Sequence, residues 1–307
     1  MSIKRLSIYL AVFFFATISA TSAFAERTPW GYGPSDGPKK WGSLTEKFSL
    51  CKDGKIQSPI NINTERVKEL KLKELDFDYK SSSAVRMINT GHTVKIVHDE
   101  PSLLKYADGS GESDLFQFHF HSPSEHTVDG RRYDMEMHLI HKNKAGNISI
   151  VGVFIREGEY NPEFDLMWDF LPKEIGDEDI FRSYNPVNLL PENKEYYKYT
   201  GSITTPPCIE NVAWFILKEP IELSAEQIET FRAVHDHNVR PLQPLNNRTV
   251  RSTGIFIDDE DIDGSGNAQV DDPFEDTFDE NFENTFEDDL IEDDSFEDTL
   301  EDTQDYE

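Results

Sequence analysis

Three histidines form the strongest chemical pattern in the sequence. His119 and His121 stand two residues apart among phenylalanines in residues 116–121, and this alternation predicts a strand. Residues i and i+2 of a strand point to one face, so both imidazoles project together. If the alternating run 133–141 pairs with this strand as an antiparallel neighbour, His138 faces them. Three neutral imidazoles with one open tetrahedral position are the ligand set of a catalytic zinc ion.

The alternative for any single histidine is an ordinary surface or core position. Two histidines at this spacing, with a third on the next strand and Glu136 close to it, favour a metal site instead. The chain has only two cysteines, and no cysteine cluster lies near the histidines. A structural zinc site is therefore disfavoured.

Two polar residues precede these histidines by two positions. Gln117 precedes His119 and Glu136 precedes His138, so each shares a strand face with its histidine. Side chains of this kind accept the second ring N–H of a metal-bound histidine and fix its tautomer. The alternative, a solvated strand face, is disfavoured for Glu136 because methionines flank it on both sides.

The elements that must position these residues are mostly strands. Alternating runs predict strands at 72–79 and 93–97, and almost continuous apolar runs predict buried central strands at 148–155 and 213–217. Helical signals are few. They comprise residues 162–170 and a segment that follows Ser224, for which Ser224 is the expected N-cap with Gln227 as its capping-box partner. This pattern predicts one large sheet with peripheral helices.

The first 25 residues have the pattern of a secretory signal. They combine a charged start at Lys4 and Arg5, an apolar core over residues 6–20 and an A-x-A sequence at 23–25. The alternative is a retained membrane anchor, which is disfavoured because the apolar run is short for a span and ends in a cleavage pattern. The sequence predicts export, with a mature domain over residues 26–257.

The charge of the chain is concentrated at its C-terminal end. Residues 258–307 hold 24 of the 59 acidic residues and no base, which leaves 35 acidic and 30 basic residues elsewhere. The domain is thus nearly balanced, and most of the net charge of −29 lies in the tail. No basic cluster is present, so nucleic acid is disfavoured as a partner.

The tail contains a degenerate four-residue repeat. Its high charge and few aliphatic residues predict disorder. Asp259, Asp261 and Asp263 resemble the start of an EF-hand loop, but Val270 stands where the loop needs glutamate, so a specific calcium site is disfavoured. Loose cation binding, a mineral surface, a protein partner and a purely solvating role remain open. Each repeat begins with a phenylalanine, at positions 274, 278, 282, 286 and 296.

Six motifs, in this order, resemble the α-class carbonic anhydrases of the secreted, bacterial type. They lie between residues 30 and 251 and read QSPINI (57–62), QFHFH (117–121), SEHTVDG (124–130), EMHLIH (136–141), GSITTPPC (201–208) and NVRPLQPLNNR (238–248). The resemblance implies an α+β, mostly β fold with a large, mainly antiparallel twisted sheet and short peripheral helices. It also implies the reversible hydration of carbon dioxide to bicarbonate and a proton by a zinc-bound hydroxide.

The resemblance assigns further roles around the zinc ion. Thr204 would accept the hydrogen of the zinc hydroxide and donate its own to Glu125. His92 would be the proton shuttle, a role that suits a group titrating near neutrality, although an exposed loop histidine would look the same in sequence. A backbone carbonyl near Asn238 would accept from His121, and Gln117 and Glu136 would be the acceptors for the other two histidines.

The same resemblance outlines the pocket and the termini. Tyr32, in an irregular arm over residues 30–41, matches a tyrosine beside the mouth. Cys51 and Cys208 match a disulfide of secreted members, and two free buried thiols are the alternative. After signal cleavage we expect a periplasmic or extracellular protein without membrane association. The residues that match the pocket lining are Ile140, Ile150, Ile203, Val212 and Trp214, with Thr205 in the same cavity.

Two rival functions deserve comparison with the enzyme. A binding module with a dead site is disfavoured because all three zinc histidines, Thr204 and Glu125 are present. An acidic cation- or mineral-binding protein that carries the enzyme as a passenger is distinguished by deletion of the tail. Weak ester hydrolysis is a conceivable side activity, since a zinc hydroxide attacks other carbonyl groups as well.

Overall fold

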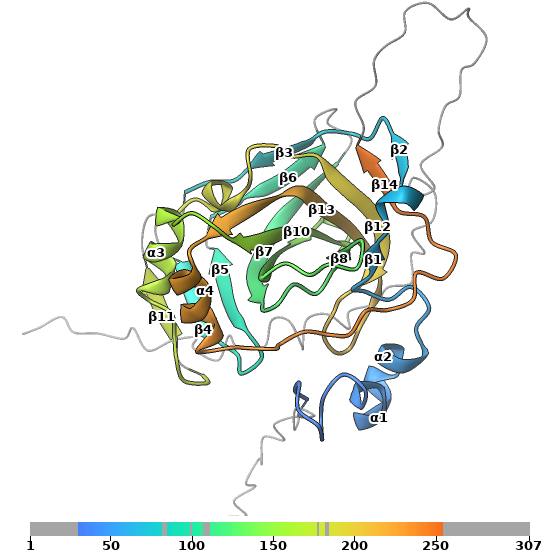
Figure 1. Cartoon of the computed structure of the whole chain (residues 1–307), viewed down its shortest axis with the longest axis horizontal. Coiled ribbons are helices and arrows are strands. Elements are labelled where there is room, and N and C mark those ends of the chain that lie inside the picture. Colours follow the sequence, from blue (N-terminus) through green and yellow to red (C-terminus); the bar gives the residue numbers. More distant parts are fainter. Residues whose placement is uncertain are drawn as a thin grey trace, which may run out of the picture. The chain divides into compact units, whose positions relative to one another are not determined.

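The computed structural model describes residues 30–81, 85–98, 100–106, 111–176, 178–181 and 184–253. Twelve strands of these described residues form one sheet, in the order β11-β4-β5-β7-β9-β10-β13-β12-β14-β2, with β6 paired to β7 and β3 paired to β6 (Figure 1). The strands are β2 (Lys68–Leu70), β3 (Leu75–Asp78), β4 (Val85–Asn89), β5 (Val94–His98), β6 (Leu103–Tyr106), β7 (Glu112–His121), β9 (Met135–Lys142), β10 (Ile148–Glu157), β11 (Glu178–Phe181), β12 (Tyr196–Ser202), β13 (Glu210–Leu223) and β14 (Arg251–Thr253).

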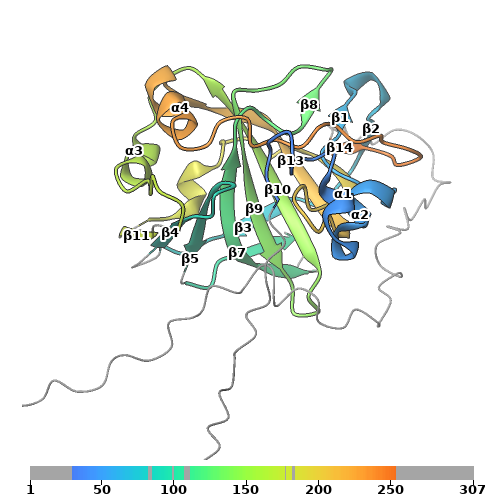
Figure 2. The same ribbon diagram turned by 90° about the horizontal axis from the view of Figure 1, so that it is seen from below.

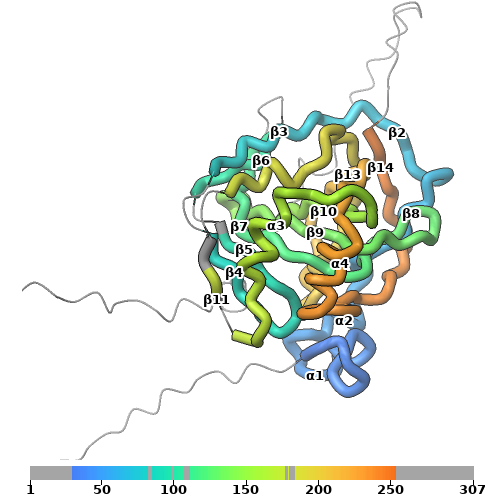
Figure 3. The backbone as a smooth tube through the Cα atoms, turned by 60° about the vertical axis from the view of Figure 1, so that its left-hand side comes forward, coloured from blue at the N-terminus to red at the C-terminus, as the bar shows by residue number. Residues whose placement is uncertain are grey.

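The sheet is mainly antiparallel, as predicted. Parallel pairing occurs between β10 and β13 and between β14 and β2. The β14–β2 pair lies at one edge of the sheet (Figure 3). A separate parallel pair joins β1 (Asn61–Ile62) to β8 (Thr127–Val128). The almost continuously apolar strands β10 and β13 lie in the middle of the sheet, where both of their faces are covered.

The helices are short and peripheral. They are α1 (Trp41–Leu44), α2 (Leu50–Asp53), α3 (Pro162–Trp168) and α4 (Ala225–Arg232), with 3-10 turns η1 (Glu46–Phe48), η2 (Thr64–Arg66) and η3 (Pro186–Leu189). Helices α3 and α4 pack together, apart from α1 and α2 (Figure 2). The capping box of α4 forms as predicted between Ser224 and Gln227. Gln227 also bonds both backbone groups of Asn161, the N-cap of α3, and so joins the two helices.

The main hydrophobic core lies between the sheet and helices α3 and α4. Phe118 and Phe120 of β7 are fully buried in it. Phe120 packs against Trp168 of α3 and Phe231 of α4, at ring-centre distances of 5.3 and 5.8 Å. Because side chains alternate along a strand, the histidines of β7 face the opposite side of the sheet.

The predicted elements are found with small differences at their ends. The strand predicted at 72–79 is confined to β3, and the helix predicted at 162–170 ends at Trp168. The described part of the chain contains no helix long and apolar enough to cross a membrane. The predicted signal segment and the acidic tail lie outside the described residues.

Candidate functional site

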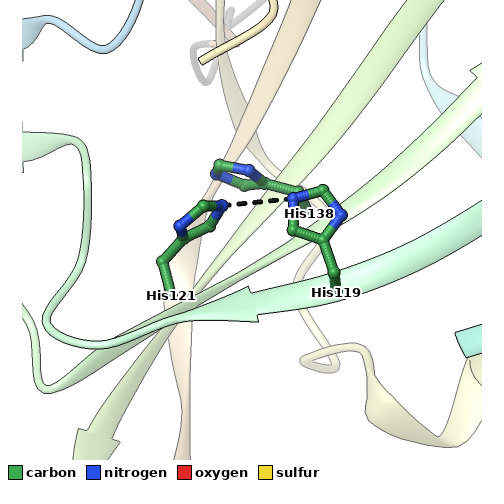
Figure 4. A group of neighbouring side chains, drawn as sticks. All are labelled: His119, His121 and His138. Carbon is green, nitrogen blue, oxygen red and sulfur yellow. Dashed lines mark hydrogen bonds between the residues drawn. The ribbon is translucent and has the colours of Figure 1, made fainter. Parts of the chain in front are cut away.

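Three imidazoles converge on the face of the sheet opposite the main core (Figure 4). His119 and His121 lie on β7, and His138 lies directly across from His119 in the register of β7 and β9. One ring nitrogen from each lies within 4.8 Å of the others. The sequence predicted this arrangement from the i, i+2 spacing and the alternation of the next strand.

The hydrogen bonds of the outer ring nitrogens fix how the histidines face one another. His119 Nδ1 lies 3.0 Å from Gln117 Oε1, and His121 Nδ1 lies 2.7 Å from the carbonyl oxygen of Asn238. His138 Nε2 lies 2.8 Å from Glu136 Oε1. Each of these acceptors takes the N–H of its neutral imidazole, so the remaining nitrogen of each ring carries a lone pair.

The lone pairs are directed at one another. His119 Nε2 and His121 Nε2 are 3.1 Å apart. With both Nδ1 atoms acting as donors, neither Nε2 has a hydrogen to share, so a cation that accepted both lone pairs would stabilise this approach. Neutral imidazoles suit zinc or a similar borderline metal ion, and the donor set therefore fits Zn²⁺.

The local electrostatics keep the first two histidines neutral. Burial lowers the pKa of His119 well below its usual range, and the neighbouring histidines lower it further. Burial also lowers the pKa of His121, against the opposing effect of the Glu125 carboxylate. Metal binding competes with protons for the same lone pairs, so histidines with low pKa values remain available as ligands at neutral pH.

Glu136 is fully buried and joins His138 to a deeper network. Its Oε1 accepts from His138 and also from His126 Nδ1 at 2.7 Å, and its Oε2 accepts from the backbone N–H of His126 at 2.8 Å. Burial opposes ionisation, but the two histidines outweigh it and hold the pKa of Glu136 well below its usual range. His126 continues through its Nε2 to the Tyr199 hydroxyl at 2.6 Å, which contacts Ser58 Oγ at 2.7 Å.

Glu125 is a second buried carboxylate, and it lies beside His121. It is fully buried, and its Oε2 lies 3.5 Å from His121 Nε2, while its Oε1 accepts from the backbone N–H of Arg240 at 2.7 Å. Thr204 is also buried. Within the described residues, however, no hydrogen bond joins Thr204 to Glu125, and Glu125 Oε2 has no hydrogen-bond partner. The expected contact between these two residues stays a prediction.

His92 lies away from the three histidines, against the N-terminal arm. Its ring stacks on Trp30 with centroids 3.6 Å apart, and its Nε2 lies 2.7 Å from the Trp30 carbonyl oxygen. The ring is only partly buried. Tyr32 of the same arm has a buried hydroxyl, and burial followed by the charge of Glu125 raises its pKa well above the usual range. The arm thus contacts both the shuttle candidate and the surroundings of Glu125.

The predicted apolar lining shares the sheet face of the histidines. Ile140 lies two residues beyond His138 on β9, pairs with Ile150 of β10, and through it with Trp214 of β13. The Trp214 ring lies 4.9 Å from that of His138. The remaining lining residues occupy β13 or the loop that precedes it: Val212 on β13 is buried, whereas Ile203 and Thr205 in the loop are half-buried.

The predicted disulfide is present. Cys51 and Cys208 are bonded, and no free cysteine occurs in the described chain. Arg240 lies beside this bridge. Its guanidinium group donates to the carbonyl oxygens of Cys51 and Ser58 and lies over the aromatic ring of Trp41.

Sequence reasoning gave no role to three residues that the structure places in these networks or beside the histidines. Tyr199 extends the Glu136–His126 chain, Arg240 binds Glu125 through its backbone, and Lys95 lies opposite His119 on the neighbouring strand. Arg240 lies within the NVRPLQPLNNR motif, which offered a signal for it. Tyr199 and Lys95 lie outside the motifs, and only the register of the strands brings them to the site.

Comparison with known proteins agrees with this geometry. A family model described as eukaryotic-type carbonic anhydrase matches residues 36–254. A carbonic anhydrase of Nostoc sp. is 39% identical over 241 residues, covering 77% of this chain and 90% of that protein. One from Neisseria gonorrhoeae is 38% identical over 76% of this chain and 92% of its own length. The solved structure of α-carbonic anhydrase from Thermovibrio ammonificans with sulfanilamide has a TM-score of 0.70 at 44% identity and covers 73% of this chain and 99% of that one.

Proposed function

We propose that this chain, which belongs to the eukaryotic-type carbonic anhydrase family, hydrates carbon dioxide reversibly at a zinc ion bound by His119, His121 and His138. The observation that carries the proposal is the convergence of three neutral imidazole lone pairs, each opposed by a fixed acceptor on its outer nitrogen. A zinc ion in such a site lowers the pKa of a water molecule toward neutrality, as carbonic anhydrases themselves exemplify.

Hydrogen-bond acceptors of the chain orient the three imidazoles and the nucleophile. Gln117, the carbonyl group of Asn238 and the Glu136 carboxylate hold the three imidazoles in the tautomers that ligation requires. Thr204 would accept a hydrogen bond from the nucleophile and donate one from its own hydroxyl to Glu125, whose Oε2 is buried and has no other donor among the described residues. This pair would admit only ligands that can donate a hydrogen.

The apolar lining of the proposed pocket suits the substrate. Carbon dioxide is neutral and weakly hydrated, so it needs no ionic contact and enters a pocket lined by residues such as Ile140, Ile150 and Trp214. Hydration releases one proton for each bicarbonate formed. His92 carries this proton to solvent: it is partly exposed, and histidine is the side chain suited to proton relay near neutral pH.

The test measures carbon dioxide hydration together with zinc content in the purified protein. We expect one zinc ion per chain, and we expect His119→Ala to lose most of the bound zinc and the activity. His237→Ala is the matched control, because this histidine lies outside the site with 80% of its side chain exposed. Bound zinc without hydration in the unaltered protein would reject the enzyme and favour a binding module.

The proposed setting is outside the cytoplasm. The disulfide and the sequence pattern of the first 25 residues support export to the periplasm or beyond. The acidic tail is proposed as a separate cation-binding segment of the exported protein.

A further inference from the structure

The proposed proton shuttle lies in a tight turn between β4 and β5. Gly91 has a φ of 82°, a conformation that favours glycine, and it lets the chain reverse directly before His92. Asn89 begins the turn: it is buried, and its Oδ1 accepts from the backbone N–H of Gly91 at 3.0 Å. The backbone N–H of Thr90 donates to the carbonyl oxygen of Thr93 at 3.0 Å and closes the turn. These local bonds fix the shape of the turn, and its position relative to the three histidines depends on bonds to other segments.

Asn238 attaches this turn to the strand that carries two of the histidines. The residue is only 2% exposed. Its Nδ2 donates to the carbonyl oxygens of His92 and Phe120, each at 3.0 Å, and its Oδ1 accepts from the backbone N–H of Ser122 at 2.9 Å. Both amide hydrogens and the amide oxygen are therefore used. The backbone carbonyl oxygen of the same residue accepts from His121.

Thr93 provides a second attachment at the same point. Its Oγ1 donates to the carbonyl oxygen of Phe120 at 2.7 Å, so this oxygen accepts from Thr93 and Asn238 together. Phe120 lies between His119 and His121 in β7, and it is fully buried in the main core. One core-anchored peptide group of β7 thus lies between two of the converging histidines and also holds the turn that carries the shuttle.

We propose that Asn238 is a positioning residue for proton transfer, whose side-chain amide sets the distance between His92 and the three histidines, with Thr93 as the second anchor. The inference rests on the proposed function, because it takes His92 as the group that carries the proton to solvent. Asn238 then serves both halves of the reaction, since its backbone carbonyl orients His121 and its side chain holds the shuttle. Accurate placement matters for such a relay, because a displacement of about 1 Å can cost about 100-fold in rate.

The kinetic constants separate the two halves of the reaction. The constant kcat/KM covers the steps from free enzyme and carbon dioxide to the release of bicarbonate, whereas the return of the proton to solvent follows that release and contributes to kcat. A residue that positions only the shuttle therefore affects kcat more than kcat/KM. A residue that only supports the fold would lower both constants together, because it would reduce the fraction of competent enzyme.

The experiment measures carbon dioxide hydration by the full chain in weakly buffered solution, with the zinc content of every variant determined. The variants are Asn238→Ala and Thr93→Val, each alone and combined with His92→Ala. Thr93→Val removes one hydroxyl group with little change of shape, so it keeps the test valid if Asn238→Ala fails to fold. Asn188→Ala is the matched control, because this exposed asparagine also donates from Nδ2, to Glu163 Oε2 at 2.9 Å, and lies in η3 against α3.

We expect kcat to fall about 5- to 20-fold in Asn238→Ala and about 2- to 5-fold in Thr93→Val, in both cases more than kcat/KM, as part of the roughly 100-fold or larger contribution that general acid–base groups make. Added imidazole buffer should restore kcat, because a dissolved base then accepts the proton. In the His92→Ala background each substitution should change kcat by less than about twofold. An unchanged kcat, an equal fall of kcat and kcat/KM, or the same fall of kcat without His92 would overturn the proposal.

A second readout requires no turnover. The His92 ring stacks on Trp30 with centroids 3.6 Å apart, so its ring protons should be shifted upfield in the NMR spectrum of the histidine-labelled full chain. His92→Ala identifies these signals by their absence. We expect the shift to shrink in Asn238→Ala and Thr93→Val and to persist in Asn188→Ala; an unchanged shift in the first two would overturn the placement. A protein that does not hydrate carbon dioxide would reject the proposed function, and the spectra would still decide whether Asn238 places His92.

Discussion

His141, a buried histidine on the sheet face opposite the three convergent histidines, makes the stability of the protein depend on pH. His141 is fully buried on β9, and its Nε2 lies 2.6 Å from the hydroxyl of Tyr79, which is also buried. Burial outweighs the opposing backbone hydrogen bonds and lowers the pKa of His141 to about 3. Burial likewise raises the pKa of Tyr79 well above its usual range, so the phenol stays protonated and can donate to the neutral imidazole.

The folded pKa of His141 lies below its unfolded value of about 6.5, so the unfolded chain binds the additional proton between the two. The stabilisation is complete above the unfolded pKa and is lost as the pH falls toward the folded one. We expect this residue alone to lower the free energy of unfolding by about 2 kcal/mol between neutral pH and about pH 5. Urea unfolding of the unaltered protein and of His141→Gln at both pH values measures the difference.

The comparison cancels the titration of all other groups common to both proteins, including His235, whose pKa is lowered to about 4 by burial and by His92. His237→Gln, at an exposed position, should keep the pH dependence of the unaltered protein. Equal pH dependence in His141→Gln would show that this histidine accepts a proton in the folded state without cost.

Strand pairing is the feature of the elements that builds the site. The sequence predicted the alternation of β7 and β9 and their antiparallel pairing, which brings His138 opposite His119. The period of two gave the faces of Gln117 and Glu136 as well. These features were accessible because strand periodicity and neighbouring position in the chain are local properties.

Contacts between distant segments could not be predicted in the same way. Lys95 lies opposite His119 only because β5 pairs with β7, and Tyr199 reaches the Glu136–His126 network only because β12 lies beside β13. Each pairing depends on the order of strands in the sheet, which no local pattern specifies. The bonding of Glu125 to the backbone of Arg240 spans 115 residues and depends on how the C-terminal loops return to the site.

The disulfide is the covalent link between two distant elements. It joins Cys51 of α2 to Cys208 in the loop before β13, with a sequence separation of 157. In the chain-entropy model a bridge that closes a loop of this length stabilises the folded state by up to about 5 kcal/mol. We expect the double variant Cys51→Ser, Cys208→Ser to lose a large part of this amount, measured by urea unfolding at neutral pH.

Reduction provides the matched control for that variant. Dithiothreitol should lower the unfolding free energy of the unaltered protein to about the value of the double variant, and should leave the double variant unchanged. If reduction has no effect on the unaltered protein, the unfolded chain gains no freedom from losing the bridge, contrary to the entropic argument.

The whole chain combines a nearly balanced domain with a strongly acidic segment. Residues 258–307 carry 24 acidic residues and no base, whereas the family model ends at residue 254. The histidines, the pocket lining and the disulfide all lie before this segment. The catalytic machinery and the acidic segment therefore occupy separate parts of the sequence, which predicts separate contributions to function.

Deletion of residues 258–307 tests this separation. We expect the kcat/KM for carbon dioxide to stay within about twofold, because every residue proposed for metal binding and catalysis precedes this segment. Calcium association, measured by equilibrium dialysis, should fall to near zero, because the removed segment holds most of the net negative charge.

A matched variant in which the acidic residues of the segment become asparagine or glutamine, with every phenylalanine kept, separates charge from the aromatic repeat. Calcium association that survives in this neutral variant would contradict a carboxylate-based site. A large loss of hydration in the deleted protein would show that the segment acts on the metal centre, and the two parts would then have to be treated as one functional unit.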